Sequence, residues 1–202
     1  MSFLKRLFGS RQPWKQRLEA RGAFGLALLL GLLLSQNAAL AQTVNWTKYD
    51  NTVPANSDGS STNGKIPLGT AGKGDTNGVT DPFVLKEGST YKMWYSGQIW
   101  GAGGSYRIYY ATSPNGLEWT KYDNTTPAVS DSVSTNGRIP LGNAGKGDAT
   151  HASIKFVLQD GSTYKMWYSG WGGTPGRYSI YYATSTNGLT WTKLDNNVPA
   201  DS

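Results

Sequence analysis

The 202-residue sequence contains no cysteine and a single histidine, His151. The absence of cysteine excludes disulfide bonds and thiolate metal ligands. A single histidine excludes a catalytic metal centre with several histidine ligands, and any Ser-His-Asp triad would have to use His151. We therefore expect neither a metal ion nor another cofactor, and the fold has to be stabilised by apolar burial and strand pairing.

An excess of positive charge is also missing once the N-terminus is set aside. Residues 1–41 hold six of the 19 Lys and Arg residues and one of the 13 Asp and Glu residues, which leaves 13 basic and 12 acidic side chains in 42–202. The resulting net charge of +1 provides no basic surface for DNA or RNA. We therefore expect no nucleic-acid partner.

Residues 1–41 have the pattern of an export signal. A basic start is followed by an apolar run over 23–34 and by the small-residue cleavage site Ala39-Leu40-Ala41. The apolar run is short for a helix that spans a bilayer unaided. We expect 1–41 to be removed as a signal peptide and the protein to be exported to the periplasm or the cell exterior. An uncleaved leader would be its one membrane contact.

The rest of the chain is an internal repeat. Phe83–Gly97 returns almost unchanged as Phe156–Gly170, and the pattern Ala-Thr-Ser-x-Asn-Gly-x-x-Trp occurs at 111–119 and again at 183–191. Short runs of Tyr, Trp, Thr and Val that are separated by Gly and Asn turns are typical of antiparallel strands. Repeats built from such strands indicate a propeller or another stacked β array.

We therefore predict an all-β fold of β-propeller type over 42–202, made of two complete four-stranded antiparallel blades after an N-terminal signal helix. Blade 1 covers about 81–123 and blade 2 about 154–195, and a lone strand at 44–50 precedes them. The expected strands are 83–86, 91–96, 106–113 and 118–122, and then 156–158, 164–169, 178–185 and 190–194. Four tryptophans are expected in the core between blades: Trp94, Trp119, Trp167 and Trp191.

Two blades do not close a ring. The sequence is therefore either a fragment of a longer propeller, a chain that completes a ring by self-association, or an open stack with exposed edges. The favoured interpretation is a fragment of a longer propeller, and the second is a ring completed by self-association.

The repeat resembles the blade motif of five-bladed propeller glycosidases, the superfamily of arabinanases, β-xylosidases and invertases. In Thr80–Gly97 an Asp-Pro pair is followed by apolar residues, a glycine, a tyrosine pair and Ser-Gly. The pattern at 111–119 is similar to the turn between the third and fourth strands of that superfamily, and distantly to the sialidase Asp-box. The resemblance covers 46–202 and implies a protein that acts on plant or microbial polysaccharides, with a carbohydrate as its ligand.

Asp81 is the one residue that matches a catalytic position of that superfamily, as a candidate base. The second copy has Ile154-Lys155 where the first has Asp81-Pro82, so blade geometry alone does not require the aspartate. Asp before Pro is also a common start of a turn. Glycoside hydrolysis normally needs two carboxylates, and neither Glu87 nor Glu118 resembles the acid of the superfamily.

Five further residues are candidates for substrate binding. Trp100 and Trp171 lie in loops between the second and third strands, where an indole either stacks on a sugar ring or packs on its own blade. His151 precedes the first strand of blade 2 and either faces the axis or hydrogen-bonds within its loop. Asp75 and Asp148 occupy equivalent places in a repeated Gly-Lys-Gly-Asp loop, and their presence in both copies favours a role in organising that loop.

Two functions follow from these patterns. The first is an exported carbohydrate-active propeller segment that resembles glycoside hydrolases and is incomplete as an enzyme without further blades. The alternative is a noncatalytic exported module that binds glycans or has a structural role. The missing acid favours the second for this stretch of sequence.

Overall fold

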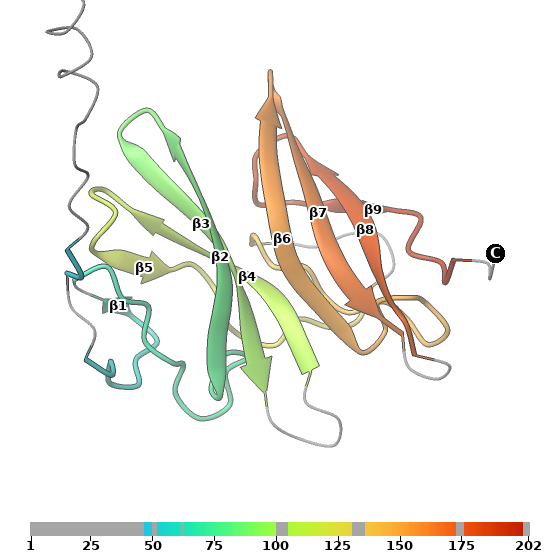
Figure 1. Ribbon diagram of the computed structural model, residues 1–202, viewed down its shortest axis with the longest axis horizontal. Helices are drawn as coiled ribbons and strands as arrows, with labels where there is room; N and C mark the ends of the chain where they lie inside the picture. The colour runs from blue at the N-terminus through green and yellow to red at the C-terminus, as the bar shows by residue number, and fades with distance from the viewer. Residues whose placement is uncertain are drawn as a thin grey trace, which may run out of the picture. The chain divides into compact units, whose positions relative to one another are not determined.

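The computed structural model describes residues 47–49, 52–61, 63–99, 105–130, 136–172 and 176–199, and these residues form an all-β protein (Figure 1). They contain nine strands and no helix, so the described part of the chain has no helix suited to spanning a bilayer. The expected signal peptide, 1–41, lies outside the described residues. Of the lone strand expected at 44–50, only 47–49 are described, and they form no strand.

The first sheet has the order β1-β5-β4-β3-β2, and all of its neighbouring strands are antiparallel. Its strands are β1 (Ser60–Ser61), β2 (Gly78–Glu87), β3 (Thr90–Ile99), β4 (Ser105–Ser113) and β5 (Trp119–Lys121). The strands β2 to β5 follow one another as a meander, and β1 pairs with the free edge of β5.

The second sheet is a four-stranded antiparallel meander with the order β6-β7-β8-β9. Its strands are β6 (His151–Asp160), β7 (Thr163–Trp171), β8 (Tyr178–Ser185) and β9 (Thr192–Leu194). The prediction of two units of four sequential antiparallel strands is confirmed. β2 and β6 begin earlier than predicted, because each continues through an irregularity that interrupts the alternating sequence pattern.

Side chains of the repeated Ser-x-Asn-Gly-x-x-Trp pattern build the turn between β4 and β5. The Ser113 hydroxyl accepts hydrogen bonds from the Asn115 and Gly116 amides at 3.2 and 2.8 Å, and the Asn115 side chain accepts two more, both at 2.9 Å, from following amides. Gly116 has a φ of 78°, and Trp119 Nε1 donates to its carbonyl at 3.0 Å. The same turn joins β8 to β9 through Ser185, Asn187, Gly188 and Trp191.

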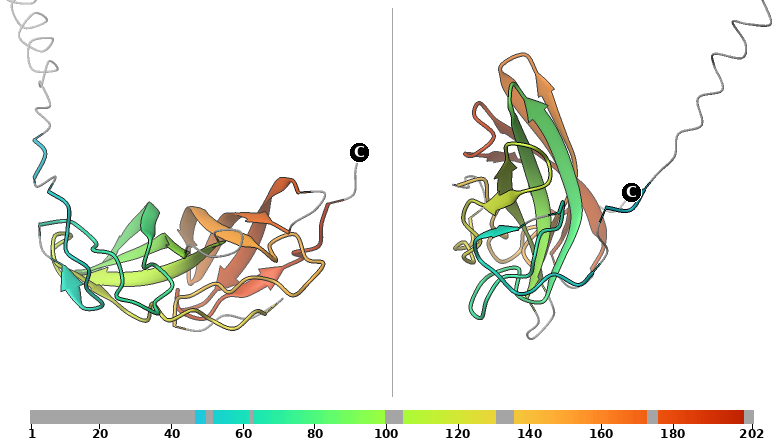
Figure 2. Two further views of the ribbon diagram at one scale, coloured as in Figure 1. Left: turned by 90° about the horizontal axis from the view of Figure 1, so that it is seen from below. Right: turned by 90° about the vertical axis from the view of Figure 1, so that its left-hand side faces the viewer.

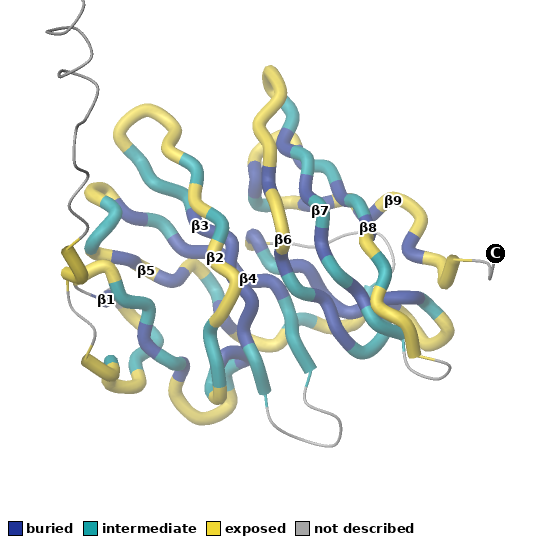
Figure 3. The backbone as a smooth tube through the Cα atoms, viewed as in Figure 1, coloured by how far each residue is buried: buried dark blue, intermediate teal, exposed yellow. Residues whose placement is uncertain are grey.

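The two sheets pack face to face, with β6 lying against β2, β3 and β4 (Figure 2). Trp94 is at the centre of this contact. It is fully buried, donates from Nε1 to the Gly188 carbonyl at 3.1 Å, and meets Trp191 edge to face at 5.9 Å. Buried residues accordingly gather where the sheets meet (Figure 3).

Three of the four tryptophans expected in the core are buried, and the fourth is partly exposed. Trp94, Trp119 and Trp191 are buried as predicted. Trp167, the counterpart of Trp94 in the second copy, is only half-buried. The reason is positional, since the second sheet covers the face that contains Trp94, and the described residues include no third sheet to cover Trp167.

Candidate functional site

Each sheet has a β-bulge in its first strand. The register between β2 and β3 shifts at Asp81-Pro82, and the register between β6 and β7 shifts at Lys155. A bulge bends its strand and turns a side chain out of the regular alternation. The two copies place different residue types at this point, and the bulges expose both Asp81 and Lys155.

Asp81 and Lys155 meet across the two sheets. Lys155 Nζ lies 3.3 Å from Asp81 Oδ2, and the lysine and aspartate side chains are 45% and 43% exposed. An ion pair this exposed contributes little to stability. Asp81 also has a φ of 48°, a left-handed conformation that costs energy for a residue with a Cβ and that Asp and Asn tolerate best. Backbone strain of this kind often accompanies a functional site.

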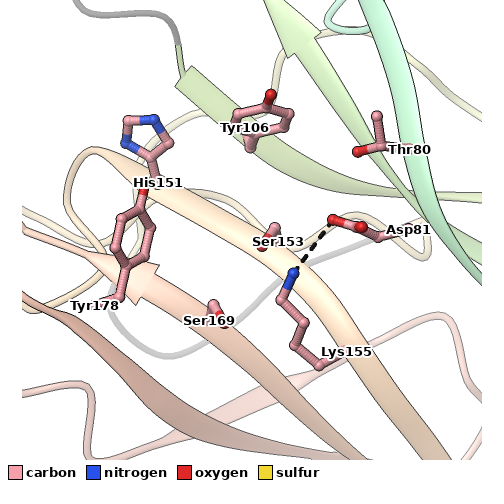
Figure 4. A pocket seen from close by; sticks show the side chains of 8 residues that line it. All are labelled: Thr80, Asp81, Tyr106, His151, Ser153, Lys155, Ser169 and Tyr178. Carbon is pink, nitrogen blue, oxygen red and sulfur yellow. Dashed lines mark hydrogen bonds and ion pairs between the residues drawn. The ribbon is translucent and has the colours of Figure 1, made fainter.

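A pocket of about 500 Å³ opens beside this ion pair (Figure 4). It is lined by a carboxylate, an ammonium group, aliphatic hydroxyls, phenols and an imidazole: Asp81, Lys155, Thr80, Ser153, Ser169, Tyr106, Tyr178 and His151. Three of these residues come from the first sheet and five from the second. The volume is in the range of small-molecule sites, and both sheets are needed to form the pocket.

His151 is the aromatic centre of the pocket. It is 9% exposed, and three rings surround it: Trp171 at 5.2 Å, Tyr106 at 5.7 Å and Tyr178 at 6.1 Å between centroids. The imidazole is therefore held in position by packing, while Tyr178 remains 66% exposed and accessible to a ligand.

Trp171 packs against two residues that line the pocket, His151 and Tyr178. Its ring stacks on Tyr178 with a centroid distance of 6.4 Å and an interplanar angle of 27°. A Cβ added to Gly176 would lie 1.9 Å from the indole nitrogen, so Gly176 also packs closely on the ring. Trp171 therefore packs on its own sheet, one of the two arrangements expected for it. The other candidate tryptophan, Trp100, lies outside the described residues.

Asp75 does not reach the pocket. It is 0% exposed and accepts hydrogen bonds from Tyr95 and Asn124, both at 2.9 Å, while Lys121 Nζ lies 2.8 Å away. Burial and then the charge of Asp75 raise the pKa of Tyr95 well above its usual value, so the phenol remains a proton donor.

Asp148 is in the same position in the second copy and is also 0% exposed. Its partners are Tyr168, Lys193 and Asn196. With no accessible surface, neither aspartate is available to a ligand. The two residues fasten the loop that precedes the first strand of each sheet to the end of the same sheet, which is the role that their recurrence favoured.

Sequence reasoning did not select six of the residues that line the pocket: Thr80, Tyr106, Ser153, Lys155, Ser169 and Tyr178. The sequence pattern could have identified some of these residues. His151, Ser153 and Lys155 alternate along β6, and Tyr106 and Tyr178 are counterparts in the repeat. The pattern was hidden because the start of β6 was predicted too late in the chain.

Other carboxylates lie away from the pocket. Glu87 contacts Lys92 and accepts a hydrogen bond from the Tyr164 hydroxyl at 2.7 Å, and Glu118 is exposed after the turn at Gly116. Asp81 is thus the one carboxylate among the described residues that line the pocket. No group of three or more His, Asp and Glu side chains in the described ranges is arranged to hold a metal ion.

No family model matches the sequence. Two proteins of Mycobacterium tuberculosis, "Uncharacterized protein Rv1502" of strain H37Rv and "Uncharacterized protein MT1551" of strain CDC 1551, are each 32% identical to it over 131 residues. The matched segment is 63% of this chain and 38% of each relative. The chain therefore spans well under half the length of these relatives.

Two solved structures have a partly similar backbone. A BT0996 RGII complex matches 72% of this chain and 39% of its own, with 18% identity and a TM-score of 0.45. A protein named "Glycoside hydrolase" matches 76% of this chain and 42% of its own, with 17% identity and a TM-score of 0.48. Likeness at this level assigns no activity to the present chain.

Proposed function

We propose that the pocket between the two sheets binds a carbohydrate and that the protein does so after export. The observation that supports this most is the chemistry of the lining. An exposed phenol, Tyr178, offers a flat face for the C–H side of a sugar ring, while Asp81, Lys155 and the serine hydroxyls offer acceptors and donors for sugar hydroxyls.

The charge of the pocket favours an uncharged glycan. Asp81 and Lys155 carry opposite charges and lie within 3.3 Å of each other, so neither sign dominates. A nucleic acid or another polyanion would need an excess of positive charge, which 42–202 lacks.

Hydrolysis of the bound glycan is a second candidate. It is favoured by the position of Asp81, which is accessible, backbone-strained and beside the pocket. Hydrolysis normally needs a second carboxylate about 5 to 10 Å away, and Asp81 is the one carboxylate that lines the described pocket. Binding is therefore the function that the described residues support by themselves, and catalysis would need a further sheet to contribute the acid.

The test is calorimetric titration of the full chain with neutral oligosaccharides derived from arabinan, xylan and fructan. We expect one of these to bind, and Asp81→Asn and Tyr178→Ala each to weaken binding at least tenfold, the equivalent of about 1.4 kcal/mol. Tyr122→Ala is the matched control, because Tyr122 is a 54% exposed tyrosine outside the pocket. No binding by any oligosaccharide, or equal weakening in the control, would contradict the proposal.

Two further measurements on the same samples complete the test. Release of reducing ends that is lost in Asp81→Asn even at saturating oligosaccharide would support hydrolysis with Asp81 as base. Export predicts that the protein recovered from a bacterial host begins at Gln42, which mass spectrometry of the N-terminus determines. Retention of 1–41 would instead favour the membrane-anchored form.

A further inference from the structure

The first sheet has an outer face whose central residues are buried by the second sheet and by the segment that precedes β6. Ile108 is 0% exposed, and its carbonyl accepts a hydrogen bond from the Ile139 amide at 3.0 Å. Tyr110 is 3% exposed and packs so closely that a Cβ added to Gly137 would lie 2.3 Å from the Cβ of Tyr110. Trp94, Ile108 and Tyr110 therefore form an outer face on the first sheet that packs closely against the residues covering it.

The second sheet has the same outer face without a cover among the described residues. The counterparts of Trp94, Ile108 and Tyr110 are Trp167, Ile180 and Tyr182. Ile180 is 62% exposed where Ile108 is 0% exposed. The pair Trp167 and Tyr182 has a centroid distance of 5.2 Å and an angle of 50°, against 5.3 Å and 50° for Trp94 and Tyr110. The uncovered face is therefore already in the conformation that the covered one has.

The inner face of the first sheet matches the inner face of the second sheet, which is the surface that covers Trp94 in the internal interface. The inner face of the second sheet receives Trp94 and contains Val157, which is 1% exposed. Its counterpart on the inner face of the first sheet, Val84, is 41% exposed. Beside the counterpart of Ile139, Ile66, the structure has a cavity of about 170 Å³.

The glycines of this inner face are open to a partner as well. Gly188 accepts the indole of Trp94, and a Cβ added there would lie 3.0 Å from that ring. Its counterpart Gly116 has nothing nearer than its own sheet's Tyr91, at 3.7 Å. Gly64, the counterpart of Gly137, would meet only Leu117, at 3.6 Å.

The polar contacts of the interface also have counterparts. Glu87 and Lys92 pair on the first sheet, and both bond the Tyr164 hydroxyl of the second sheet, at 2.7 and 2.9 Å. In the second sheet the equivalent pair is Asp160 and Lys165, 2.7 Å apart, and it has no phenol from a third sheet among the described residues. Tyr91 of the first sheet is the counterpart of Tyr164 and is in a position to supply that phenol to another copy.

We propose that copies of this chain associate head to tail, with the outer face of the second sheet of one copy on the inner face of the first sheet of the next. The occupant is a second copy because this chain already contains both halves of the interface and joins them once internally. Such a heterologous contact continues from copy to copy until the assembly closes. This assembly is independent of whether the pocket binds a carbohydrate.

The assembly would also change the pocket. The Ser96 hydroxyl accepts a hydrogen bond from the Ile154 amide at 3.1 Å across the internal interface. The counterparts of these two residues are Ser169, which lines the pocket, and Asp81. In the assembly the next copy would therefore place its own Asp81 beside Ser169, which brings a second carboxylate to the same pocket.

The test uses light scattering of the full chain and of two single variants that damage opposite ends. Ile180→Glu puts a charge on the outer face, and Val84→Glu puts one on the inner face. Since both positions are at least 41% exposed within one chain, neither variant should unfold it. We expect the unmodified chain to be a multiple of the chain mass and each variant alone to be a single chain.

Mixing the two variants tests the polarity of the contact. Each variant retains one intact end, and the two intact ends are complementary, so the mixture should form dimers that contain one chain of each variant and nothing larger. A monomeric unmodified chain, or a Val84→Glu variant that still dimerises alone, would overturn the proposal, because the second result would mean a symmetric contact. Leu194→Glu is the control, since its counterpart Tyr122 is 54% exposed despite the internal interface.

A disulfide trap provides an independent readout, because the chain has no cysteine of its own. Ile108 and Ile139 form an antiparallel bridge, and opposed residues of such a bridge have the separation that a disulfide needs. The combined variant Ile66→Cys and Ile180→Cys should therefore form disulfide-linked multimers on oxidation. The mismatched combination of Ile180→Cys with Val129→Cys should not, and equal cross-linking in both would show random collision and contradict the proposal.

Discussion

The two sheets of this protein have nearly the same sequence and nearly the same internal geometry, and yet the same side chains have different environments in each. Trp94 is 0% exposed and Trp167 is half-buried, and Ile108 is 0% exposed against 62% for Ile180. Nothing within either sheet accounts for the difference. The difference follows from what lies against each sheet. In a stacked β array, the burial of a residue therefore depends on the neighbouring sheet as much as on the residue itself.

The places where the copies differ are equally informative. Asp81-Pro82 in the first copy corresponds to Ile154-Lys155 in the second, and Gly78 corresponds to His151. Asp81, Lys155 and His151 all line the pocket. The parts of the repeat that build strands, turns and loop anchors are shared, and so are the pocket tyrosines Tyr106 and Tyr178, whereas these three pocket residues differ from their counterparts in the other copy.

Substitution of Trp94 should cost the most stability. Trp94→Ala should lower the free energy of unfolding by about 5 kcal/mol, because it leaves a large cavity and removes the hydrogen bond to Gly188. Trp167→Ala should cost less than half as much, since its ring is already partly solvated. Urea unfolding in the Ile180→Glu background, which keeps chains apart, measures both.

The outcome at Trp167 also depends on assembly. Without the Ile180→Glu change and at high protein concentration, the cost of Trp167→Ala should rise toward that of Trp94→Ala. Equal costs for the two variants in separated chains would contradict the view that cover by the second sheet distinguishes the two residues.

The next prediction concerns a feature that the two copies share. Lys121→Met and Lys193→Met should each lower the free energy of unfolding by about 3 kcal/mol, because each leaves an aspartate charge buried without its ion-pair partner. The two costs should agree, since the anchors have the same partners and 0 to 1% exposed side chains. Lys155→Met is the control, because its pair with Asp81 is exposed and its loss should cost much less. A large difference between the two anchors would contradict their equivalence.

A weaker effect is expected on the pH dependence of the free energy of unfolding. A hydrogen bond from Lys92, followed by one from the Tyr164 hydroxyl, holds the pKa of Glu87 below its ordinary value of 4.5. A depressed carboxyl pKa contributes stability that is present above the ordinary value and lost as pH falls through the native one. Glu87→Gln should therefore flatten the loss of stability below about pH 4.5, by less than about 1 kcal/mol because the group is solvent-screened.

Asp160→Asn is the matched variant for that measurement. The pKa of Asp160 is also lowered, by the hydrogen bond from Lys165 and then by its charge, but no residue of another sheet contributes among the causes. Urea unfolding between pH 3 and 7 should show a smaller flattening for Asp160→Asn than for Glu87→Gln. An equal or larger flattening for Asp160→Asn would mean that the hydrogen bond from Tyr164 to Glu87 across the interface adds nothing to the pH dependence of the free energy of unfolding.

Much of the fold could be predicted from the sequence, and less of the site. The repeat, the strands and the Ser-x-Asn-Gly turns depend on residues close together in the chain, where alternation and turn chemistry can be read directly. Asp81 and His151 were selected and both line the pocket. Their approach to Tyr106, Tyr178 and Lys155 could not be predicted, because the bulges and the packing of two distant sheets determine it.

A repeated antiparallel β structure without cysteine chemistry, with recurring tryptophan turns and with equivalent residues at Asp75 and Asp148, could be recognised from the amino-acid sequence. Only the packing of the folded chain shows that the two aspartates are buried anchors, that Trp94 is covered while Trp167 is not, and that Asp81 meets Lys155 at a pocket. The physical reason is that strand pairing and turns arise from local sequence. Burial and pocket formation depend on which sheet faces which, and residues far apart in the chain determine that.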